Sequence, residues 1–340
     1  MTKIVVTGGL GYIGSHTVVA RQNKGFEVLI IDDLSNSNIS VLKGIEKITN
    51  IKPAFFKIDL KNKELVRNFF KNNSVDGVIH FAASKAVGES VQNPLKYYEN
   101  NLATLIYLLQ EMQKNKVDNL IFSSSCTVYG DADKMPVTEK TPIKKAENAY
   151  GNTKQIGEEI IADTVKISKL KAIALRYFNP IGAHKSICIG ELPIGVPQNL
   201  VPYITQTAIG IRKELLVFGN DYNTPDGTPI RDYLHVSDLA EAHVVAIKRL
   251  LDNKQKNKME YFNIGTGVGS TVLDVIHSFE KVNNLKIPYR IAPRRKGDVT
   301  AYLADVSFAN SELGWKSKRT LDDALRSAWQ WQLKLKKDAK

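Results

Sequence analysis

The first half of the chain alternates short apolar, β-branched runs with longer stretches of helical periodicity. Strands are predicted at residues 3–8, 27–32, 54–59, 77–82, 119–125 and 171–179. Between the fourth and fifth of these, Leu102, Leu105, Leu109 and Met112 recur at steps of three and four and form one apolar helix face. Strands that alternate with helices predict an α/β fold with a doubly wound parallel sheet.

The pattern changes after residue 179. Residues 180–199 and 219–233 are rich in Pro and Gly, which indicates loops. Residues 235–251 and 260–267 return to helix and strand character, and Ser237 is the predicted cap of that helix. We therefore predict two domains. The first covers 1–179, with its sheet completed by parts of 233–267, and a smaller, loop-rich α/β domain covers 180–340.

A glycine loop, TGGLGYIGS, joins the first predicted strand to the first helix. Gly8, Gly11 and Gly14 lie at steps of three, which permits a tight turn, close approach of backbone N–H groups to a pyrophosphate, and tight helix packing. Asp32 ends the second strand, where its carboxylate can accept from ribose hydroxyls. Since that carboxylate repels a 2′-phosphate, the sequence predicts a Rossmann-type domain that binds NAD rather than NADP. Asp59, at the end of the third strand, is the predicted adenine contact.

The pentapeptide YGNTK places Tyr150 and Lys154 four residues apart, on one face of a helix. A lysine ammonium, together with the positive ring of NAD⁺, favours a phenolate and lowers a tyrosine pKa. Such a base can remove the proton of a sugar hydroxyl. Ser125 ends the predicted fifth strand, and the carboxyl ends of strands are where doubly wound folds bind ligands. We therefore predict Tyr150, Lys154 and Ser125 as catalytic residues.

Composition narrows the choice of function. With 340 residues and 43% hydrophobic content, the chain can bury a large core. Only two cysteines are present, Cys126 and Cys188, without CxxC or spaced His/Cys sets, so neither a disulfide framework nor a metal site is expected. The net charge of +12 suits an anionic partner, but the lysines are scattered and no nucleic-acid motif occurs. A phosphorylated small-molecule substrate fits this charge.

The N-terminus enters a strand directly and has no signal-peptide pattern. No apolar run reaches the roughly 18 residues that a membrane span needs. We expect a cytoplasmic protein with no membrane partner.

Several motifs together carry a resemblance to a known family. They are TGGLGYIGS, HFAASKAVGESVQNP, FSSSCTVYGD, YGNTK, RYFNPIGAH, VFGNDYNTPDGTPIRDYLHVSDLA and APRRKGDVTAYLAD. From about residue 3 to the helix near 331, the chain resembles the extended short-chain dehydrogenases/reductases, and within them the enzymes that epimerise UDP-sugars at C4. The resemblance implies reversible interconversion of UDP-galactose and UDP-glucose through a 4-keto sugar. It also implies tightly bound NAD and a homodimer.

The resemblance assigns roles to individual residues. Tyr150 removes the proton from the sugar O4, Lys154 holds the nicotinamide ribose, and Ser125 orders the proton path. The implied cofactor site consists of Gly8, Gly11, Tyr12, Ile13, Gly14, Asp32, Asp33, Leu34, Ser35, Asn36, Ser37, Asp59, Leu60, Phe81, Ala82, Ala83, Ser84, Lys85, Asn100, Ser125, Tyr150, Lys154 and Phe178. The implied substrate site consists of Ser125, Tyr150, Asn179, Asn199, Leu200, Leu216, Val217, Phe218, Arg231, Arg295, Asp298 and Tyr302.

Three alternatives stay open at this point. A nucleotide-sugar 4,6-dehydratase shares the fold and the Tyr/Lys pair, but it needs carboxylates just after Ser125, where this chain has Cys126 and Thr127. An epimerase of uronic or N-acetylated UDP-sugars differs only in its hexose pocket. A binding protein that senses the cofactor usually lacks the tyrosine or the lysine. Cys126 stands where a smaller residue is common, and we expect it to be a packed residue rather than a redox group.

Overall fold

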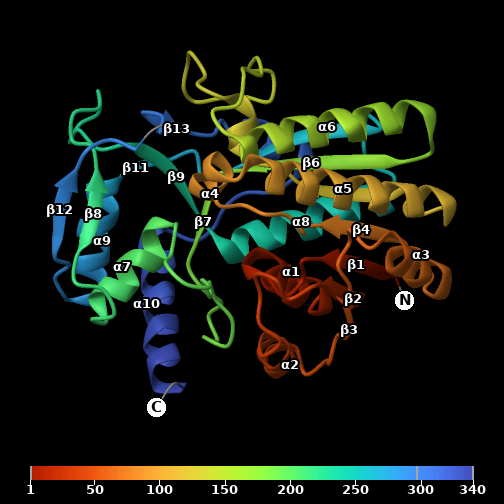
Figure 1. Cartoon of the computed structure of the whole chain (residues 1–340), viewed down its shortest axis with the longest axis horizontal. Helices are drawn as coiled ribbons and strands as arrows, with labels where there is room; N and C mark the ends of the chain where they lie inside the picture. Colours follow the sequence, from red (N-terminus) through yellow and green to blue (C-terminus); the bar gives the residue numbers. More distant parts are fainter. Residues whose placement is uncertain (1, 296–297, 339–340) are drawn as a thin grey trace.

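Seven parallel strands form the main sheet of the molecule. The structure is a computed structural model that describes residues 2–295 and 298–338 (Figure 1). In spatial order the strands are β10 (Met259–Ile264), β6 (Lys171–Tyr177), β5 (Asn119–Ser123), β4 (Gly77–His80), β1 (Lys3–Thr7), β2 (Glu27–Asp32) and β3 (Ala54–Lys57). The strand order reverses between β1 and β4, and ligands of doubly wound sheets bind beside such a switch point.

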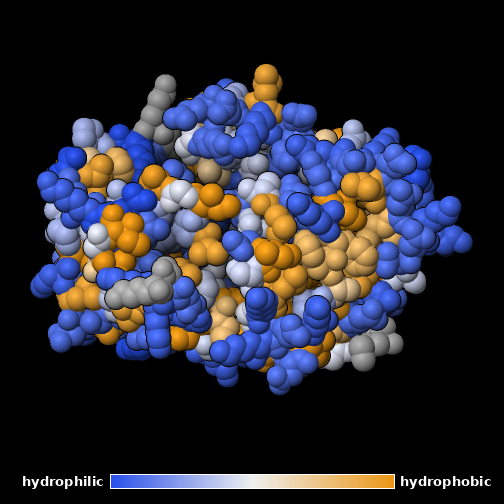
Figure 2. All heavy atoms as spheres, turned by 60° about the horizontal axis from the view of Figure 1, so that its bottom comes forward, coloured by the Kyte–Doolittle hydropathy of each residue, from blue (hydrophilic) through white to orange (hydrophobic). Residues whose placement is uncertain are grey.

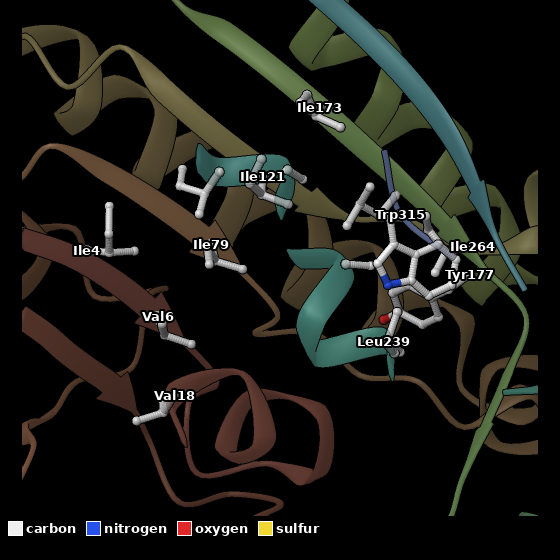
Figure 3. Packing of buried hydrophobic residues seen from close by; sticks show 14 of the residues in the cluster. Ile4, Val6, Val18, Ile79, Ile121, Ile173, Tyr177, Leu239, Ile264 and Trp315 are labelled. Atoms are coloured by element: carbon white, nitrogen blue, oxygen red, sulfur yellow. The ribbon is translucent and has the colours of Figure 1, made fainter. Parts of the chain in front are cut away.

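Helices cover both faces of this sheet. One face packs against α1 (Tyr12–Gln22), α2 (Val41–Thr49) and α8 (Val236–Leu251). The other packs against α3 (Lys63–Asn72), α5 (Pro94–Lys114) and α6 (Ala149–Ile167), and α4 (Val87–Gln92) precedes α5. Figure 3 shows side chains of β1, β4, β5 and β6 in the first of these cores, with Leu239, Ile264 and Trp315 around Tyr177 at one end.

The second lobe lies beside the carboxyl ends of the main strands (Figure 1). It contains β7 (Asn179–Ile181), β9 (Ile230–His235), β11 (Gly269–Thr271) and β13 (Ala301–Tyr302) in one sheet, and β8 (Leu215–Phe218) paired with β12 (Tyr289–Ala292) in another. Its helices are α7 (Leu200–Ala208), α9 (Val272–Asn283) and α10 (Leu321–Asp338). Two short turns complete the elements, η1 (Cys126–Tyr129) in the first lobe and η2 (Ala309–Leu313) after β13.

A small apolar cluster joins the two lobes. Cys126, Val128 and Phe178 of the first lobe pack there with Tyr302 of β13 and with Ala304, two residues further along the chain. This contact brings the end of β5 next to β13. It fixes the spacing between the predicted catalytic residues and the predicted substrate residues.

The fold confirms the predicted doubly wound parallel sheet, and all six predicted strands are present. Five of them end one or two residues earlier than predicted. The seventh strand, β10, falls within the segment expected to complete the sheet. The predicted cap was wrong: His235, not Ser237, caps α8, because its Nδ1 accepts from the Ser237 N–H. The domain boundaries remain a prediction.

Candidate active site

The glycine loop leaves the N-terminus of α1 open. Gly11 caps this helix without a side-chain hydrogen bond, and its first turn carries no acidic residue. A Cβ at Gly14 would lie 2.2 Å from the Gly8 carbonyl oxygen, and Gly8 itself has a φ of +65°. Only glycine allows this packing, which leaves the amides of Tyr12 and Ile13 and the helix dipole available to an anion.

Asp32 braces the loops around this helix end. Its Oδ2 accepts from the Leu10 N–H at 3.0 Å, and its Oδ1 accepts from the Leu34 N–H at 2.9 Å and the Ser37 hydroxyl at 2.7 Å. A carboxylate has about four acceptor positions, so one remains for a ribose hydroxyl. Asp33 closes the next turn, accepting from the N–H and hydroxyl of Ser35. The predicted run from Asp32 through Asn36 to Ser37 thus forms one ordered loop.

The third strand ends earlier than predicted, so Asp59 lies in the following turn rather than in β3. Its Oδ1 accepts from the Lys61 N–H at 2.9 Å. Leu60 is buried among the core residues beneath α3 and α5. Asp59 therefore remains accessible at the sheet edge, while Leu60 supports it from below.

Residues after β4 form the other wall of the predicted cofactor site. The Phe81 ring lies 4.6 Å from the ring of His243 on α8, tilted by 47°, and the Ala82 N–H donates to Thr7 Oγ1 at 3.3 Å. Ser84 receives a hydrogen bond from Asn100, and its backbone N–H donates to Asn101 Oδ1 at 2.8 Å. The segment from Phe81 through Ala83 to Lys85 is therefore held against α8 and α5.

Tyr150 and Lys154 lie in the first turns of α6, which Asn148 caps through the Gly151 N–H. Both side chains are buried, at 8% and 4% exposure. Lys154 Nζ lies 5.9 Å from the Tyr150 ring centroid and donates to the Ser123 carbonyl oxygen at 2.6 Å. The predicted pair is therefore brought together, one helical turn apart, at the end of β5.

Burial dominates the electrostatics of this pair. Desolvation raises the pKa of Tyr150 well above its ordinary value, although the Ser125 side chain acts in the opposite direction. Desolvation also lowers the pKa of Lys154 to about 8, against the carboxylate of Glu158. The expected lowering of the Tyr150 pKa is thus not a property of the protein alone. It requires further positive charge from a bound ligand.

Ser125 precedes η1, and its Oγ accepts from the Thr127 N–H at 3.3 Å. Cys126 is buried, and desolvation raises its thiol pKa to about 12. A thiol with such a pKa stays protonated and unreactive at neutral pH. The interpretation of Cys126 as a packed residue agrees with its place beside Phe178 and Tyr302.

Arg231 lies on β9 in the second lobe and forms an ion pair with Asp298. Its guanidinium lies 5.5 Å from the Tyr302 ring centroid. The Tyr302 hydroxyl donates to the Gly130 carbonyl oxygen at 3.0 Å, which ties it to the loop after η1. The positive charge of Arg231 partly offsets the desolvation that raises the thiol pKa of Cys126, the neighbour of Ser125. The predicted phosphate-binding arginine and the catalytic lobe are therefore adjacent.

The predicted uridine pocket stays a prediction, and the structure describes its residues one by one. The Arg295 guanidinium, in the loop after β12, lies 4.0 Å from the ring centroid of Phe218 on β8. Along β8, Val217 is fully buried in the core of the second lobe, whereas Leu216 and Phe218 are half-buried on the other face. Because side chains alternate along a strand, only the backbone of Val217 can reach the side that carries Phe218.

Asn179 begins β7, two residues after the end of β6. Asn199 caps α7 by position, ahead of the half-buried Leu200, and its side-chain amide donates to Glu191 Oε1 at 2.7 Å. Lys85 reaches the same oxygen at 3.6 Å from the first lobe. Glu191 thus links a predicted cofactor residue and a predicted substrate residue.

Sequence reasoning missed two buried hydrogen bonds at this site. The Tyr177 hydroxyl lies 2.5 Å from Oγ of Ser123, the residue whose carbonyl oxygen accepts from Lys154. Asn101 donates to Thr153 Oγ1 at 3.0 Å and thereby ties α5 to the start of α6. The only sequence signal was proximity to motif residues Phe178 and Asn100. Among the described residues, no cluster of three or more His, Cys, Asp or Glu could hold a metal ion, and no helix could cross a membrane.

Comparison with known proteins identifies the family to which the chain belongs. A family model described as GDP-mannose 4,6 dehydratase matches residues 5–328. UDP-glucose 4-epimerase of Haemophilus influenzae is 47% identical over 330 residues, which cover 97% of this chain and 97% of the relative. The chain belongs to the UDP-glucose 4-epimerase family. This family lies within the extended short-chain dehydrogenases/reductases, as the motifs implied.

Solved structures of this family share the whole architecture. The crystal structure of UDP-glucose-4-epimerase from Stenotrophomonas maltophila, with bound NAD and formylated UDP-arabinopyranose, has a TM-score of 0.96 at 44% identity and covers 99% of this chain and 100% of its own. The Bifidobacterium longum enzyme, in complex with NAD⁺ and UDP, has a TM-score of 0.94 at 45% identity and covers 98% of both chains. The Rossmann-type fold is therefore that of the epimerases along its full length.

Proposed function

We propose that this protein interconverts UDP-galactose and UDP-glucose by inverting C4 of the hexose through a transient 4-keto sugar. The observation that carries the proposal is the buried Tyr150–Lys154 pair beside Ser125, adjacent to the lobe that presents Arg231. The relatives named UDP-glucose 4-epimerase, similar over 97% of the chain, support the same reaction. Within the described residues, the apolar cluster packs Cys126, the neighbour of Ser125, with Tyr302, and Tyr302 pairs with Arg231 between β13 and β9.

Bound NAD fits the residues present. The uncapped N-terminus of α1 would hold the pyrophosphate, and Asp32 would accept from the adenosine ribose. Asp59 and Leu60 would flank the adenine, and the Phe81–Lys85 segment would line the remaining wall with Asn100 and Phe178. When bound, the nicotinamide ring supplies the acceptor for the C4 hydride and returns it to the opposite face of the ketone.

The side chains of the protein manage the proton and hold the substrate. Tyr150 takes the O4 proton, Ser125 hydrogen-bonds the same oxygen, and the Lys154 ammonium stabilises the phenolate. Arg231 and Arg295 hold the diphosphate, since the planar guanidinium pairs with phosphate oxygens in two-point contacts. Asn179, Asn199, Leu200, Leu216, Phe218 and Asp298 complete the uridine and sugar contacts, with Val217 contributing its backbone.

Specific residues argue against each of the three alternative functions. A dehydratase needs carboxylates after Ser125, and both Cys126 and Thr127 lack them, although the matching family model carries a dehydratase description. A cofactor-sensing binding protein has no use for a positioned Tyr150–Lys154 pair. An N-acetyl-sugar epimerase needs space where the buried Tyr302 ring lies.

We also propose that the protein is a cytoplasmic homodimer. The resemblance implies this assembly, and exposed apolar side chains near the start of α5, Val91 and Leu95, support a contact surface there. Figure 2 shows hydrophobic residues interspersed among hydrophilic ones on one face, with the hydrophilic residues concentrated at its rim. Both cysteines are free thiols, as a reducing compartment favours. Sedimentation at micromolar concentration should give twice the 37.9 kDa chain mass.

The direct test is to incubate the purified protein with UDP-galactose without added NAD. Formation of UDP-glucose would support the reaction and the retained cofactor together. Formation of a 4-keto-6-deoxy sugar would indicate a dehydratase instead, and no turnover on any UDP-hexose would indicate a binding protein.

A further inference from the structure

Glu158 lies behind the candidate catalytic residues rather than among them. It follows Lys154 by four residues on α6, and Lys154 in turn follows Tyr150 by four, so all three share one helix face. The Glu158 side chain is 4% exposed, as is its partner Arg176 on β6. A buried ion pair is at best weak evidence for stability, because desolvation offsets the attraction. Because this pair lies close to Tyr150, Lys154 and Ser125, we consider a role in the chemistry instead of one in stability.

The Glu158 carboxylate binds three donors from two strands. Its Oε1 accepts from the Ser124 hydroxyl at 2.6 Å and from Arg176 Nε at 2.9 Å, and its Oε2 accepts from Arg176 Nη2 at 2.6 Å. Ser124 immediately precedes Ser125, and Arg176 immediately precedes Tyr177. One carboxylate therefore ties the helix that carries Tyr150 and Lys154 to the strand end that carries Ser125.

The charges around Lys154 come from several elements. On α6 they are Tyr150 and Glu158, and on β4 the buried His80, whose pKa burial lowers to about 3, so that it is neutral at physiological pH. The Ser123 carbonyl oxygen on β5 accepts from Lys154, and Tyr177 on β6 bonds Ser123. Glu158 is the one group here whose charge raises the pKa of Lys154 against desolvation.

We propose that Glu158 is a positioning residue for the epimerisation: it fixes Ser125 through the Ser124 hydroxyl and holds its carboxylate one helical turn from Lys154 on the same face of α6. This inference rests on the proposed function. It assigns the buried pair a role in the chemistry, whereas the pair itself touches neither the sugar nor the cofactor. The pH at which turnover declines on the alkaline side is then set partly by a residue outside the binding site.

The decisive variant is Glu158→Gln, which keeps the shape and removes the charge. Its pH profile of kcat is compared with that of the wild type, together with NAD content and the thermal midpoint. We expect the alkaline decline to move to lower pH by about one unit, and kcat at neutral pH to fall about 5- to 10-fold. Glu158→Asp should restore the alkaline decline but not kcat, because its shorter side chain keeps the charge without reaching Ser124.

The matched control is Glu260→Gln. Glu260 forms a similarly buried, two-point ion pair with Arg249 on α8, away from Lys154. This variant should lose thermal stability and leave the pH profile unchanged. If Glu158→Gln and Glu260→Gln both left the profile unchanged, or both shifted it equally, the positioning role would be wrong.

Loss of Glu158 leaves Arg176 uncompensated in the interior, and such a variant can fail to fold. The double variant Glu158→Leu with Arg176→Met removes both charges and retains volume, so its alkaline decline is measured in that case. We expect a smaller shift in the same direction, because the opposing positive charge of Arg176 is removed as well. An inactive wild-type protein would overturn the proposed function. An active wild type with an unmoved decline in these variants would overturn only the role of Glu158.

Discussion

Lys154 places its ammonium 5.9 Å from the centroid of the Tyr150 ring, one turn further along α6, while donating to the Ser123 carbonyl oxygen. Both groups are buried, and in the protein alone burial favours the neutral form of each. The pair is therefore prepared for proton transfer only when a bound ligand adds positive charge. Cofactor binding and activation of the base are coupled by this geometry.

Replacing Tyr150 with Phe removes only the proposed base. We expect a loss in kcat of roughly 10² or more, the usual contribution of a positioned base, with the fold and NAD content retained. Steady-state assays with UDP-galactose measure it. Tyr107→Phe, on the half-buried surface of α5, serves as the control with unchanged activity. Near-normal turnover by the Tyr150 variant would reject this residue as the base.

Gly14→Ala tests the cofactor loop. The added Cβ would lie 2.2 Å from the Gly8 carbonyl oxygen and 2.9 Å from Gly9 Cα, so the loop has to move away from the helix end. We expect NAD content after purification to drop at least about tenfold, the equivalent of 1.4 kcal/mol of binding free energy. Gly88→Ala, whose nearest contact would be an ordinary 3.7 Å, should retain NAD. Full NAD occupancy in both variants would argue against this site.

Acid should destabilise the protein already at pH values well above those at which carboxylates titrate. Burial lowers the histidine pKa from 6.5 to about 3 for His16 and His80, and to about 4 for His184, His235 and His243. Between pH 6.5 and 4 the unfolded chain binds more protons than the folded one, so the free energy of unfolding falls as pH falls. From pH 7 to 5.5 the loss is about 1 kcal/mol per buried histidine.

Urea unfolding at several pH values measures this effect, and the five histidines together predict a loss of several kcal/mol. A free energy of unfolding that stays constant between pH 7 and 5.5 would contradict the burial of these rings in their neutral forms.

Tyr302 is the expected gatekeeper of the sugar pocket. Its ring is 9% exposed and held through the Gly130 carbonyl oxygen, so bulk at C2 of the hexose competes for space beside it. Overpacking costs about 1–3 kcal/mol, or roughly 5- to 150-fold in rate. We expect little activity on UDP-N-acetylglucosamine and a gain in Tyr302→Cys. Tyr302→Phe keeps the bulk and should stay selective. Comparable wild-type kcat/KM for plain and N-acetylated sugars would remove this role.

The sequence predicted those parts of the molecule that local patterns determine. The first six strands follow from short apolar runs, all of which become buried except the aromatic edge strand β3, and the Tyr150–Lys154 pair follows from helical spacing alone. The cap of α8 did not follow from the sequence, because histidine is not a typical cap residue. His235 serves as the cap because it is the last residue of β9 and directly precedes the helix. Val217 was assigned to the pocket with its neighbours, whereas the strand's alternation turns its side chain into the core.

Other features depend on contacts between distant segments and leave no local pattern. The Glu158–Arg176 pair joins a helix to a strand, and the Tyr177–Ser123 bond joins two adjacent strands whose order only the folded sheet sets. The pKa of Tyr150 depends on how deeply α6 is buried. Predicting such contacts and pKa shifts requires the tertiary structure, even where the sequence points to the residues concerned.

In the proposed reaction, the hydrogen removed from C4 returns to C4 of the same sugar on its opposite face. UDP-galactose carrying deuterium at C4 tests it most directly, with the product examined by mass spectrometry and NMR in ordinary water. We expect UDP-glucose that retains the deuterium at C4, with no deuterium in the solvent and no net formation of NADH. Deuterium lost to water would contradict it and indicate exchange of a proton instead.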